Sequence, residues 1–415
     1  MQLSKYSFGI GDRFARQGEA QLKAFVDAGK KGVKITPVWN KSNREHLTIG
    51  SAHPETRKEA DEAARNLNWD GPWFVDADHI NMSNVDGFIG SSDFFTIDVA
   101  DYIGKKATDA DLESFTRSNS SFTGTFKIPG IEESYSLSRE MIYRIGEKFL
   151  FAVKEAAKIY RHIESKKGKN NFITEISMDE VSESQSPLEL FFILSAVSAE
   201  NIPVQTIAPK FSGRFNKGVD YEGDLDNFAR EFEQDLMVID EAVKKFNLPG
   251  NLKLSVHSGS DKFSIYPVMG ELIKKHEKGI HIKTAGTTWL EEMTGLALAG
   301  GEALGLAKKI YGEALIRFDE LCGPYATVID IDRAGLPGAG DVADWDGERF
   351  ANALRHEPDH PEYNPDMRQL VHVGYKIAAE QGKMFTGMLE KYRDIIAPQV
   401  TDNIYRRHFQ RIFDV

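Results

Sequence analysis

The sequence of 415 residues contains only one cysteine, Cys322. A single cysteine cannot form an internal disulfide, and it cannot supply the thiolates of a structural zinc site. No run of about 18 apolar residues occurs, which is the length that a membrane-spanning helix needs. The N-terminal segment, MQLSKYSFGIGDRF, lacks the apolar core of a secretion signal. These absences predict a cytoplasmic protein in a reducing compartment, with no membrane partner.

Basic residues are outnumbered by acidic ones, 51 to 63, and the formal net charge is −12. A nucleic-acid partner requires a basic surface, so we expect none, although a few local cations could still hold a small anionic substrate. Nucleotide-binding motifs are also missing. Gly9-Ile10-Gly11 is followed by Asp12-Arg13-Phe14, which does not complete a dinucleotide fingerprint, and no P-loop or Gly-x-Ser-x-Gly elbow occurs. We therefore expect no nucleotide cofactor.

The chain does contain short strand-like segments that alternate with longer helix-like ones. Residues 252–257 show the pattern: aliphatic side chains alternate with polar ones, and a Ser-Gly-Ser turn follows. Helices are predicted over 19–28, 54–67, 138–166, 187–200, 224–246 and from about 265. The predicted strands are 6–10, 32–39, 73–80, 93–99, 171–177, 203–210, 252–257 and 279–287. Eight strands alternating with helices predict an α/β fold, a (β/α)8 TIM-like barrel.

Two segments exceed a minimal barrel. Residues 105–135, after the fourth strand, contain FTGTFKIPG and are predicted to form either a lid over the active site or a small hairpin. Residues 333–415 begin with a Gly/Pro/Asp-rich loop and become helical from about residue 367. We interpret them as a C-terminal extension packed on a barrel of residues 1–332, within a single structural domain.

Inward-pointing residues near the carboxyl ends of barrel strands line the active site, and outward-pointing ones pack under helices. Sorting each strand by this rule places several acids, histidines and lysines inside. Two histidines and a carboxylate suit a divalent metal ion such as Zn²⁺, Mn²⁺, Ni²⁺ or Co²⁺. The predicted metal ligands are Glu175, His257 and His281, with Asp78 or His79 as a fourth. A single strand-end histidine is more often only hydrogen-bonded in the core, so the prediction depends on the whole cluster.

Lysines and arginines near strand ends have two interpretations. Lys210 and Lys283 could form a Schiff base with a ketone, or could be charge-paired cations, which we favour because metal chemistry is available. Cations that could hold a substrate anion are Lys41, Arg214 and Lys217, although a charged loop is more often simply solvated. The predicted substrate-binding residues are Lys210, Arg214, Lys217, Lys41, Ser255 and Asp261.

Long strings across nearly the whole chain resemble the tagaturonate epimerase family. They are FGIGDRFARQGEAQ, FVDADHINM, TEISMDE, PKFSGRFNKGVDYEGD, SVHSGSDKF and HIKTAGTTWLEE. The resemblance implies a metal-dependent inversion at C4 of a 2-keto hexuronate, which interconverts fructuronate and tagaturonate in bacterial hexuronate catabolism. It also implies that some relatives convert fructose into tagatose. A keto-sugar substrate and a homo-oligomeric state fit this resemblance.

The expected route of inversion follows from the chemistry of C4. Its hydrogen is not acidic because C4 is β to the carbonyl, whereas cleavage of the C3–C4 bond yields an aldehyde and an enediolate that a metal ion stabilises. Asp78 and Lys283 are the predicted acid–base pair, with His79 in reserve. Two alternatives remain open: a metal-dependent aldolase or keto-sugar isomerase on the same barrel, and a non-catalytic sugar-binding protein. The density of titratable groups disfavours the second.

Overall fold

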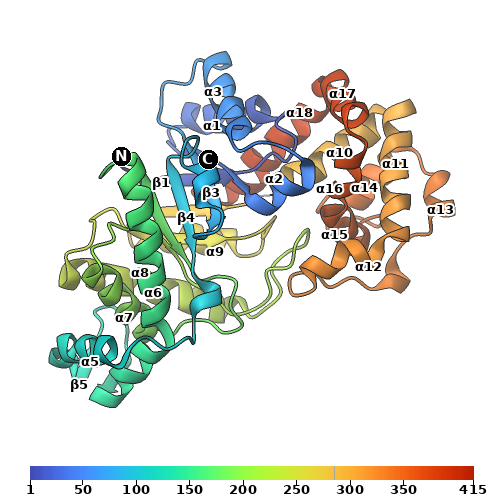
Figure 1. Ribbon diagram of the computed structural model, residues 1–415. Coiled ribbons are helices and arrows are strands. Elements are labelled where there is room, and N and C mark those ends of the chain that lie inside the picture. Colours follow the sequence, from blue (N-terminus) through green and yellow to red (C-terminus); the bar gives the residue numbers. More distant parts are fainter. Residues whose placement is uncertain (285) are drawn as a thin grey trace.

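The computed structural model describes residues 1–284 and 286–415, and its centre is a closed barrel of parallel strands (Figure 1). Neighbouring strands follow the order β1-β2-β3-β4-β7-β8-β9-β10 and return to β1. This arrangement confirms the predicted (β/α)8 barrel. The strands are β1 (Tyr6–Ile10), β2 (Thr36–Ser42), β3 (Phe74–Ile80), β4 (Phe94–Asp98), β7 (Ile173–Ser177), β8 (Thr206–Ala208), β9 (Lys253–His257) and β10 (Ile280–Lys283).

Strand boundaries differ most from the prediction in three strands. The second strand begins at Thr36 rather than at Gly32, whose φ of +90° belongs to a turn after the preceding helix. The sixth strand, β8, keeps only three of the eight predicted residues. The last predicted strand segment, 279–287, forms a strand only over Ile280–Lys283, and residue 285 within it lies outside the described residues.

Helices cover the outside of the barrel close to where the sequence predicts them. They are α1 (Gly18–Lys30), α3 (Pro54–Asn66), α6 (Arg139–Lys167), α7 (Pro187–Ala199), α8 (Leu225–Phe246) and α9 (Tyr266–Lys275). Short helices α2 (Asn43–Ile49) and α4 (Val85–Phe88) were not predicted. Helix α2 starts directly after β2, where Ser42 and Glu45 form a reciprocal capping box.

The barrel interior is apolar at its amino end and polar at its carboxyl end. Leu3, Val38, Phe74, Phe94 and Ile173 form a small separate apolar cluster. The next inward residues along β4 and β7 are Thr96 and Glu175, which are fully buried and neighbours in register. Outward residues of the same strands, such as Phe95, Ile97 and Ile176, belong to the large core beneath the helices. The predicted alternation thus directs polar groups to the carboxyl ends of the strands.

The insertion after β4 forms helix α5 (Asp109–Ser118) and an antiparallel hairpin of β5 (Gly124–Lys127) and β6 (Ser134–Leu137). The hairpin alternative of the prediction is therefore present. Phe122 and Phe126 pack against Phe191 of α7, with ring centroids 5.3 and 5.0 Å apart. In Figure 1 this segment lies beside α6 and α7, far from the C-terminal helices. Among the described residues that line the large cavity below, none comes from residues 105–135.

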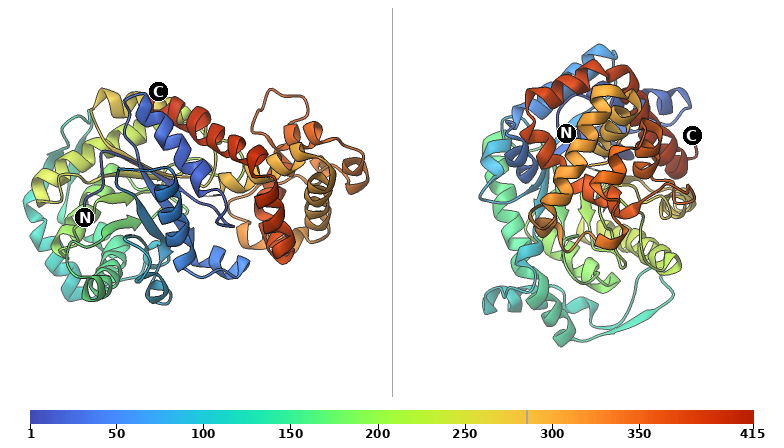
Figure 2. Two further views of the ribbon diagram at one scale, coloured as in Figure 1. Left: turned by 90° about the horizontal axis from the view of Figure 1, so that it is seen from above. Right: turned by 90° about the vertical axis from the view of Figure 1, so that its right-hand side faces the viewer.

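Helices after β10 form an extension beside the barrel (Figure 1). The chain then runs back along the barrel through its last helices (Figure 2). Phe409 on this returning segment packs against Phe8 of β1 and Phe25 of α1, with ring centroids 5.0 and 4.9 Å apart. The helices are α10 (Thr287–Ala299), α11 (Gly301–Ile316), α12 (Phe318–Cys322), α13 (Ala339–Ala343), α14 (Gly347–Leu354), α15 (Pro365–Val373), α16 (Tyr375–Glu380), α17 (Lys383–Lys391), α18 (Arg393–Asp402), the π-helix η5 (Asn403–Phe409) and α19 (Gln410–Phe413). Helical structure thus begins well before residue 367, and the division at residue 332 stays a prediction.

In the part of the chain that the structure describes, none of the helices combines the length and apolarity needed to span a bilayer.

Candidate active site

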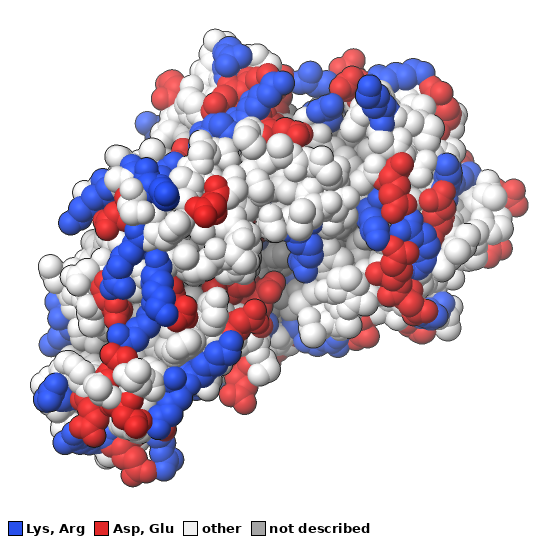
Figure 3. Space-filling view, in the orientation of Figure 1, with Lys and Arg blue, Asp and Glu red and all other residues white. Residues whose placement is uncertain are grey.

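A cavity of about 670 Å³ opens at the carboxyl ends of the barrel strands. Its walls come from strand ends and following loops, from helix α2, and from residues 324–328 of the extension. The space-filling view shows the surface hollowed between the barrel and the extension, with side chains of both charges around the hollow (Figure 3). Active sites of (β/α)8 barrels lie at this face. The extension therefore completes the wall of the candidate site.

Three side chains in this cavity form a group that could hold a metal ion. His79, Asp179 and His257 each direct one donor atom to within 4.8 Å of the others. Asp179 Oδ1 lies 3.4 Å from His79 Nε2 and 3.2 Å from His257 Nδ1. Two imidazoles and one carboxylate suit a borderline divalent ion and leave coordination positions open for substrate oxygens.

The second nitrogen of each imidazole faces a further carboxylate. His79 Nδ1 lies 2.9 Å from Asp78 Oδ1, and His257 Nε2 lies 2.8 Å from Glu175 Oε1. Carboxylates in this position fix the tautomer of a metal-binding histidine, because they accept its N–H and leave the other nitrogen free to bind. The residues present therefore fit a divalent metal ion, with Asp78 and Glu175 orienting the two histidines.

Electrostatics at this group also favour a cation. Burial would lower the pKa of His257, but Asp179 and Glu175 raise it to about 9. Burial would likewise lower the pKa of His79, but Asp78 and Asp179 raise it well above its usual value. Both shifts show that the carboxylates present more negative charge than neutral imidazoles can balance. A divalent ion held by these residues would supply that balance without protonation of the histidines.

His79 reaches the site through an irregularity in β3. The register of β3 against β4 shifts between Ala77 and Ile80, and His79 has a φ of +52°. A left-handed backbone is unfavourable for a residue other than glycine, and such strain concentrates at functional sites. The bulge redirects the His79 side chain towards Asp179. Strand alternation alone cannot reveal this orientation.

Lys283 lies at the centre of the acidic groups. Its Nζ is 2.6 Å from Asp76, 3.1 Å from Asp78 and 2.9 Å from Glu175. Burial would lower the pKa of Lys283, but these carboxylates raise it above its usual value. The side chain is thus held as an ammonium ion, which disfavours a Schiff base at this position. The structure brings the predicted acid–base pair, Asp78 and Lys283, into contact.

His281 lies apart from the candidate metal group. It is opposite Ser255 in register, whereas Lys283 is opposite His257, so His281 is closer to the amino end of the barrel. Its Nδ1 is 2.9 Å from Ser7 Oγ, and burial lowers its pKa to about 3. Of the three first-choice ligands Glu175, His257 and His281, only His257 belongs to the candidate group, with Glu175 behind it. His79, predicted as a possible fourth ligand, also belongs to it.

Asp179 was not selected from the sequence, although it lies within TEISMDE only two residues after the end of β7. A carboxylate placed directly after a barrel strand is the signal that could have identified it.

The predicted substrate-binding cations separate into two groups. Lys210 and Lys217 line the cavity. Arg214 is half-exposed and lies 2.7 Å from Asp330, outside the cavity wall. Lys41 is buried, and its Nζ donates to the carbonyl oxygen of Arg13 at 2.8 Å.

The remaining predicted contacts, Ser255 and Asp261, are buried away from the cavity lining. Asp261 accepts a hydrogen bond from Arg368 Nη2 at 2.6 Å. Arg368 belongs to α15, so this fully buried ion pair joins the loop after β9 to the extension. Asp261 therefore has a packing partner of its own, and its assignment to substrate stays a prediction.

Asp98, at the carboxyl end of β4, is a further candidate that the sequence did not single out. It lines the cavity, and the backbone N–H of Ala100 donates to its Oδ1 at 3.0 Å. Burial raises the pKa of Asp98, although His79 acts in the opposite sense. Asp78 differs: burial would raise its pKa, but His79 and Lys283 lower it well below its usual value. Two carboxyl groups whose pKa values are shifted in opposite directions therefore face one cavity.

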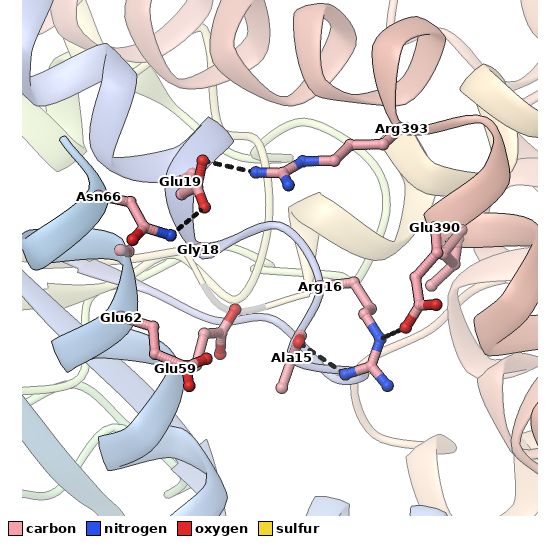
Figure 4. Close-up of a pocket in the computed structure, with 11 residues that line it drawn as sticks. Ala15, Arg16, Gly18, Glu19, Glu59, Glu62, Asn66, Glu390 and Arg393 are labelled. Atoms are coloured by element: carbon pink, nitrogen blue, oxygen red, sulfur yellow. Dashed lines mark hydrogen bonds and ion pairs between the residues drawn. The ribbon is translucent and has the colours of Figure 1, made fainter.

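A second cavity, of about 360 Å³, lies outside the barrel between α1, α3, α17 and α18 (Figure 4). Arg16 pairs with Glu390 at 2.9 Å, and Arg393 pairs with Glu19 at 2.6 Å. Figure 4 shows these pairs on opposite sides of the pocket. These ion pairs join the extension to the barrel. Because the two arginines are already paired with glutamates of the same cavity, we do not regard this cavity as a competing active site.

A closed (β/α)8 barrel with a cavity at the carboxyl ends of its strands, a metal-binding donor set and a buried lysine has the architecture of a barrel enzyme. The sequence model of the tagaturonate epimerase family, UxaE, matches residues 1–410. The chain therefore belongs to the tagaturonate epimerase family and is an isomerase, as the resemblance in its sequence implies.

Individual relatives agree with this assignment. The chain is 27% identical over 420 aligned positions to the tagaturonate/fructuronate epimerase of Thermotoga maritima, covering 96% of this chain and 79% of that protein. The fold is similar to a glycerol complex of the fructuronate-tagaturonate epimerase UxaE from Cohnella laeviribosi, with a TM-score of 0.81 and 21% identity over 99% of this chain and 82% of that one. The native crystal structure of that enzyme gives a TM-score of 0.78 with the same coverage.

Proposed function

We propose that this chain interconverts D-fructuronate and D-tagaturonate by inverting C4, and that it uses one divalent metal ion for this reaction. The observation that carries the proposal is the group of His79, Asp179 and His257 in the same cavity as the Lys283 ammonium. The names of the Thermotoga and Cohnella proteins support the choice of substrate. D-fructose and D-tagatose are the corresponding neutral pair.

The proposed route breaks and re-forms the C3–C4 bond. Loss of the proton on the C4 hydroxyl turns C4 into an aldehyde, while the bonding electrons move to C3 and give an enediolate over C2 and C3. A bound divalent ion would supply Lewis-acid stabilisation of that negative charge. Rotation of the aldehyde followed by re-addition gives the opposite configuration at C4. The route needs groups that move protons on oxygen and none that removes the C4 hydrogen.

Lys283 and the carboxylates of the cavity supply those groups in this proposal. The Lys283 ammonium places a positive charge beside the substrate oxygens, since its three carboxylate partners keep it protonated. Asp78 is the base predicted from the sequence, but its depressed pKa makes it weak, and its contact with His79 suits an orienting role. We assign the proton transfer on the C4 hydroxyl to Asp98, whose raised pKa lies closer to working pH.

The alternative is a metal-dependent aldolase or keto-sugar isomerase with the same residues. An aldolase releases the cleaved fragments, whereas the epimerase must retain and rotate the aldehyde. The cavity is walled by both the barrel and the extension, which favours retention of the aldehyde. The products decide between them: an epimer, two shorter fragments, or an aldose.

One experiment tests both the reaction and its route. The purified enzyme is incubated with D-fructuronate in deuterium oxide, and the products are followed by NMR. We expect D-tagaturonate with protium retained at C4, because the C4–H bond stays intact in the proposed route. Chelation should abolish the activity, and addition of Zn²⁺, Mn²⁺, Ni²⁺ or Co²⁺ should restore it.

Shorter fragments or an aldose as the main products would replace the epimerase with an aldolase or isomerase. Stoichiometric deuterium at C4 of tagaturonate would keep the epimerase and overturn the bond-cleavage route. Full activity in a chelated sample shown to be metal-free would overturn the metal requirement.

A further inference from the structure

Two cations from different elements each lie close to one aromatic ring in the active-site cavity. The Arg44 guanidinium of α2 lies 4.8 Å from the ring centroid of Tyr325, and Lys217 Nζ, from the loop after β8, lies 5.8 Å from the same centroid. Tyr325 belongs to the extension. All three residues line the cavity that contains the candidate metal group.

Neither cation is held in an ion pair by a carboxylate of the described residues, although the charge of Glu180, which also lines the cavity, acts on both. Within the described residues, Arg44 and Lys217 form no ion pair, whereas the neighbouring Arg13 pairs with Glu45 at 3.2 Å. Arg214, on the same loop as Lys217, is likewise occupied by Asp330. The cavity thus contains positive charge that is available to a ligand.

The electrostatic cost of this arrangement falls on Lys217, since burial would lower the pKa of Arg44 but its neighbours raise it. Burial lowers the pKa of Lys217, and the nearby charge of Arg44 lowers it further, while Glu180 opposes the shift. An anionic group between the two cations would relieve both the desolvation and the repulsion. Guanidinium groups bind carboxylates in a bidentate manner, which fixes the orientation of the carboxylate as well as its position.

The position of Lys217 is fixed by a network beneath its loop. Lys262 Nζ donates to the carbonyl oxygens of Asn216 and Val219 at 2.9 and 2.8 Å. The backbone N–H of Gly218 donates to Ser260 Oγ at 2.9 Å. The backbone N–H of Lys217 itself donates to the carbonyl oxygen of Val328 in the extension at 2.7 Å.

Tyr325 and Arg44 are also held in place. The hydroxyl groups of Tyr325 and Tyr375 lie 3.0 Å apart. Arg44 belongs to the first turn of α2, where the capping box of Ser42 and Glu45 fixes the start of the helix. The backbone segments that carry the two cations are therefore fixed, which lowers part of the entropic cost of holding a ligand.

We propose that Arg44 and Lys217 bind the C6 carboxylate of a hexuronate beside the Tyr325 ring, and that this pair sets the preference for uronates over neutral ketohexoses. The inference rests on the proposed function, and it identifies which end of the substrate faces the extension. The carboxylate end then lies at Tyr325, and the keto end lies towards His79, Asp179 and His257.

The test compares a charged substrate with its neutral counterpart. Michaelis constants are measured for D-fructuronate and D-fructose with the wild type, Arg44→Gln, Lys217→Met and the double variant. If fructose is not turned over, its inhibition constant against fructuronate replaces its Michaelis constant. Each single variant should raise the Michaelis constant for fructuronate roughly 10- to 100-fold and change the fructose value less than about twofold. Arg65→Gln, an exposed arginine on α3, is the matched control and should change neither value.

Equal changes for both substrates, or no change for fructuronate, would overturn the inference. If the wild type does not epimerise fructuronate, the proposed function fails, and calorimetric titration then decides the inference separately. Fructuronate binding that is strong in the wild type and weakened in Arg44→Gln would support the carboxylate site. Equal binding in both proteins, or no binding in either, would refute it.

Discussion

At the scale of single residues, the active-site cavity gives chemically identical side chains different properties. Asp78 and Asp98 both line the cavity, but only Asp78 is in contact with Lys283. That contact and the neighbouring His79 hold Asp78 ionised, whereas burial favours the neutral form of Asp98. A proton-transfer group needs a pKa near the working pH, so their environments separate an orienting carboxylate from a reactive one.

Asp98→Asn tests this separation through activity and stability together. We expect kcat for fructuronate to fall roughly 10²- to 10⁴-fold, with loss of the acid limb of the pH profile. Because the pKa of Asp98 is raised in the folded state, the folded state binds more protons than the unfolded state at pH values above 3.8, the usual pKa of an aspartate. Stability is therefore lost as pH rises through this range, and the variant should have a larger free energy of unfolding at pH 7, a gain that disappears near pH 3.8.

Steady-state kinetics and urea unfolding at both pH values make the measurement. Asp101→Asn, which removes an exposed carboxylate three residues further along the chain, is the control and should change neither quantity. Retention of activity in Asp98→Asn together with its loss in Asp78→Asn would return the base to Asp78.

At the scale of elements, the alternation of inward and outward side chains along each strand predicts much of the site, and interruptions of that alternation create the rest. Alternation along β7, β9 and β10 correctly directs Glu175, His257 and Lys283 into one polar group. The alternation of side chains does not predict the bulge that reorients His79 or the loop that places Asp179 in the cavity. Both depend on backbone geometry outside the regular strand. Strand counting does predict a C-terminal extension, but not that Tyr325 of the segment before residue 333 reaches the cavity wall.

The two possible ligand sets make different predictions for metal content. In the group of His79, Asp179 and His257, Asp179 would be a ligand and His281 would not, so Asp179→Asn should lower metal affinity by more than roughly 100-fold while His281→Gln retains it. His257 belongs to both sets, so His257→Ala should lose metal and activity with the fold preserved. Metal per chain is measured by elemental analysis, and folding by far-UV circular dichroism. Loss of metal in His281→Gln with retention in Asp179→Asn would restore the set predicted from the sequence.

At the scale of the whole molecule, the barrel and the extension are joined by buried contacts of several kinds. Asp261 and Arg368 form a fully buried ion pair, and Phe409 packs against β1 and α1. The cavity also needs both parts, since the metal group comes from the barrel and Tyr325 from the extension. A chain joined in this way should unfold in one cooperative transition, as expected for the single structural domain predicted from the sequence.

The only cysteine allows this expectation to be measured. Cys322 lies in α12 of the extension with 8% of its surface exposed, and burial raises the pKa of its thiol to about 11. It should therefore react slowly with a thiol reagent until the extension opens. In urea, we expect reactivity of Cys322 and loss of helical circular dichroism to have the same midpoint.

Phe409→Ala should move both midpoints down together, at a cost of about 3 to 5 kcal/mol, because it removes a ring packed against the barrel. Ile316→Ala, on a helix of the extension with 86% of the side chain exposed, should change stability by no more than about 0.5 kcal/mol. A thiol that becomes reactive at lower urea than the main transition would mean that the extension unfolds alone, and that the active-site cavity can lose one wall while the barrel stays folded.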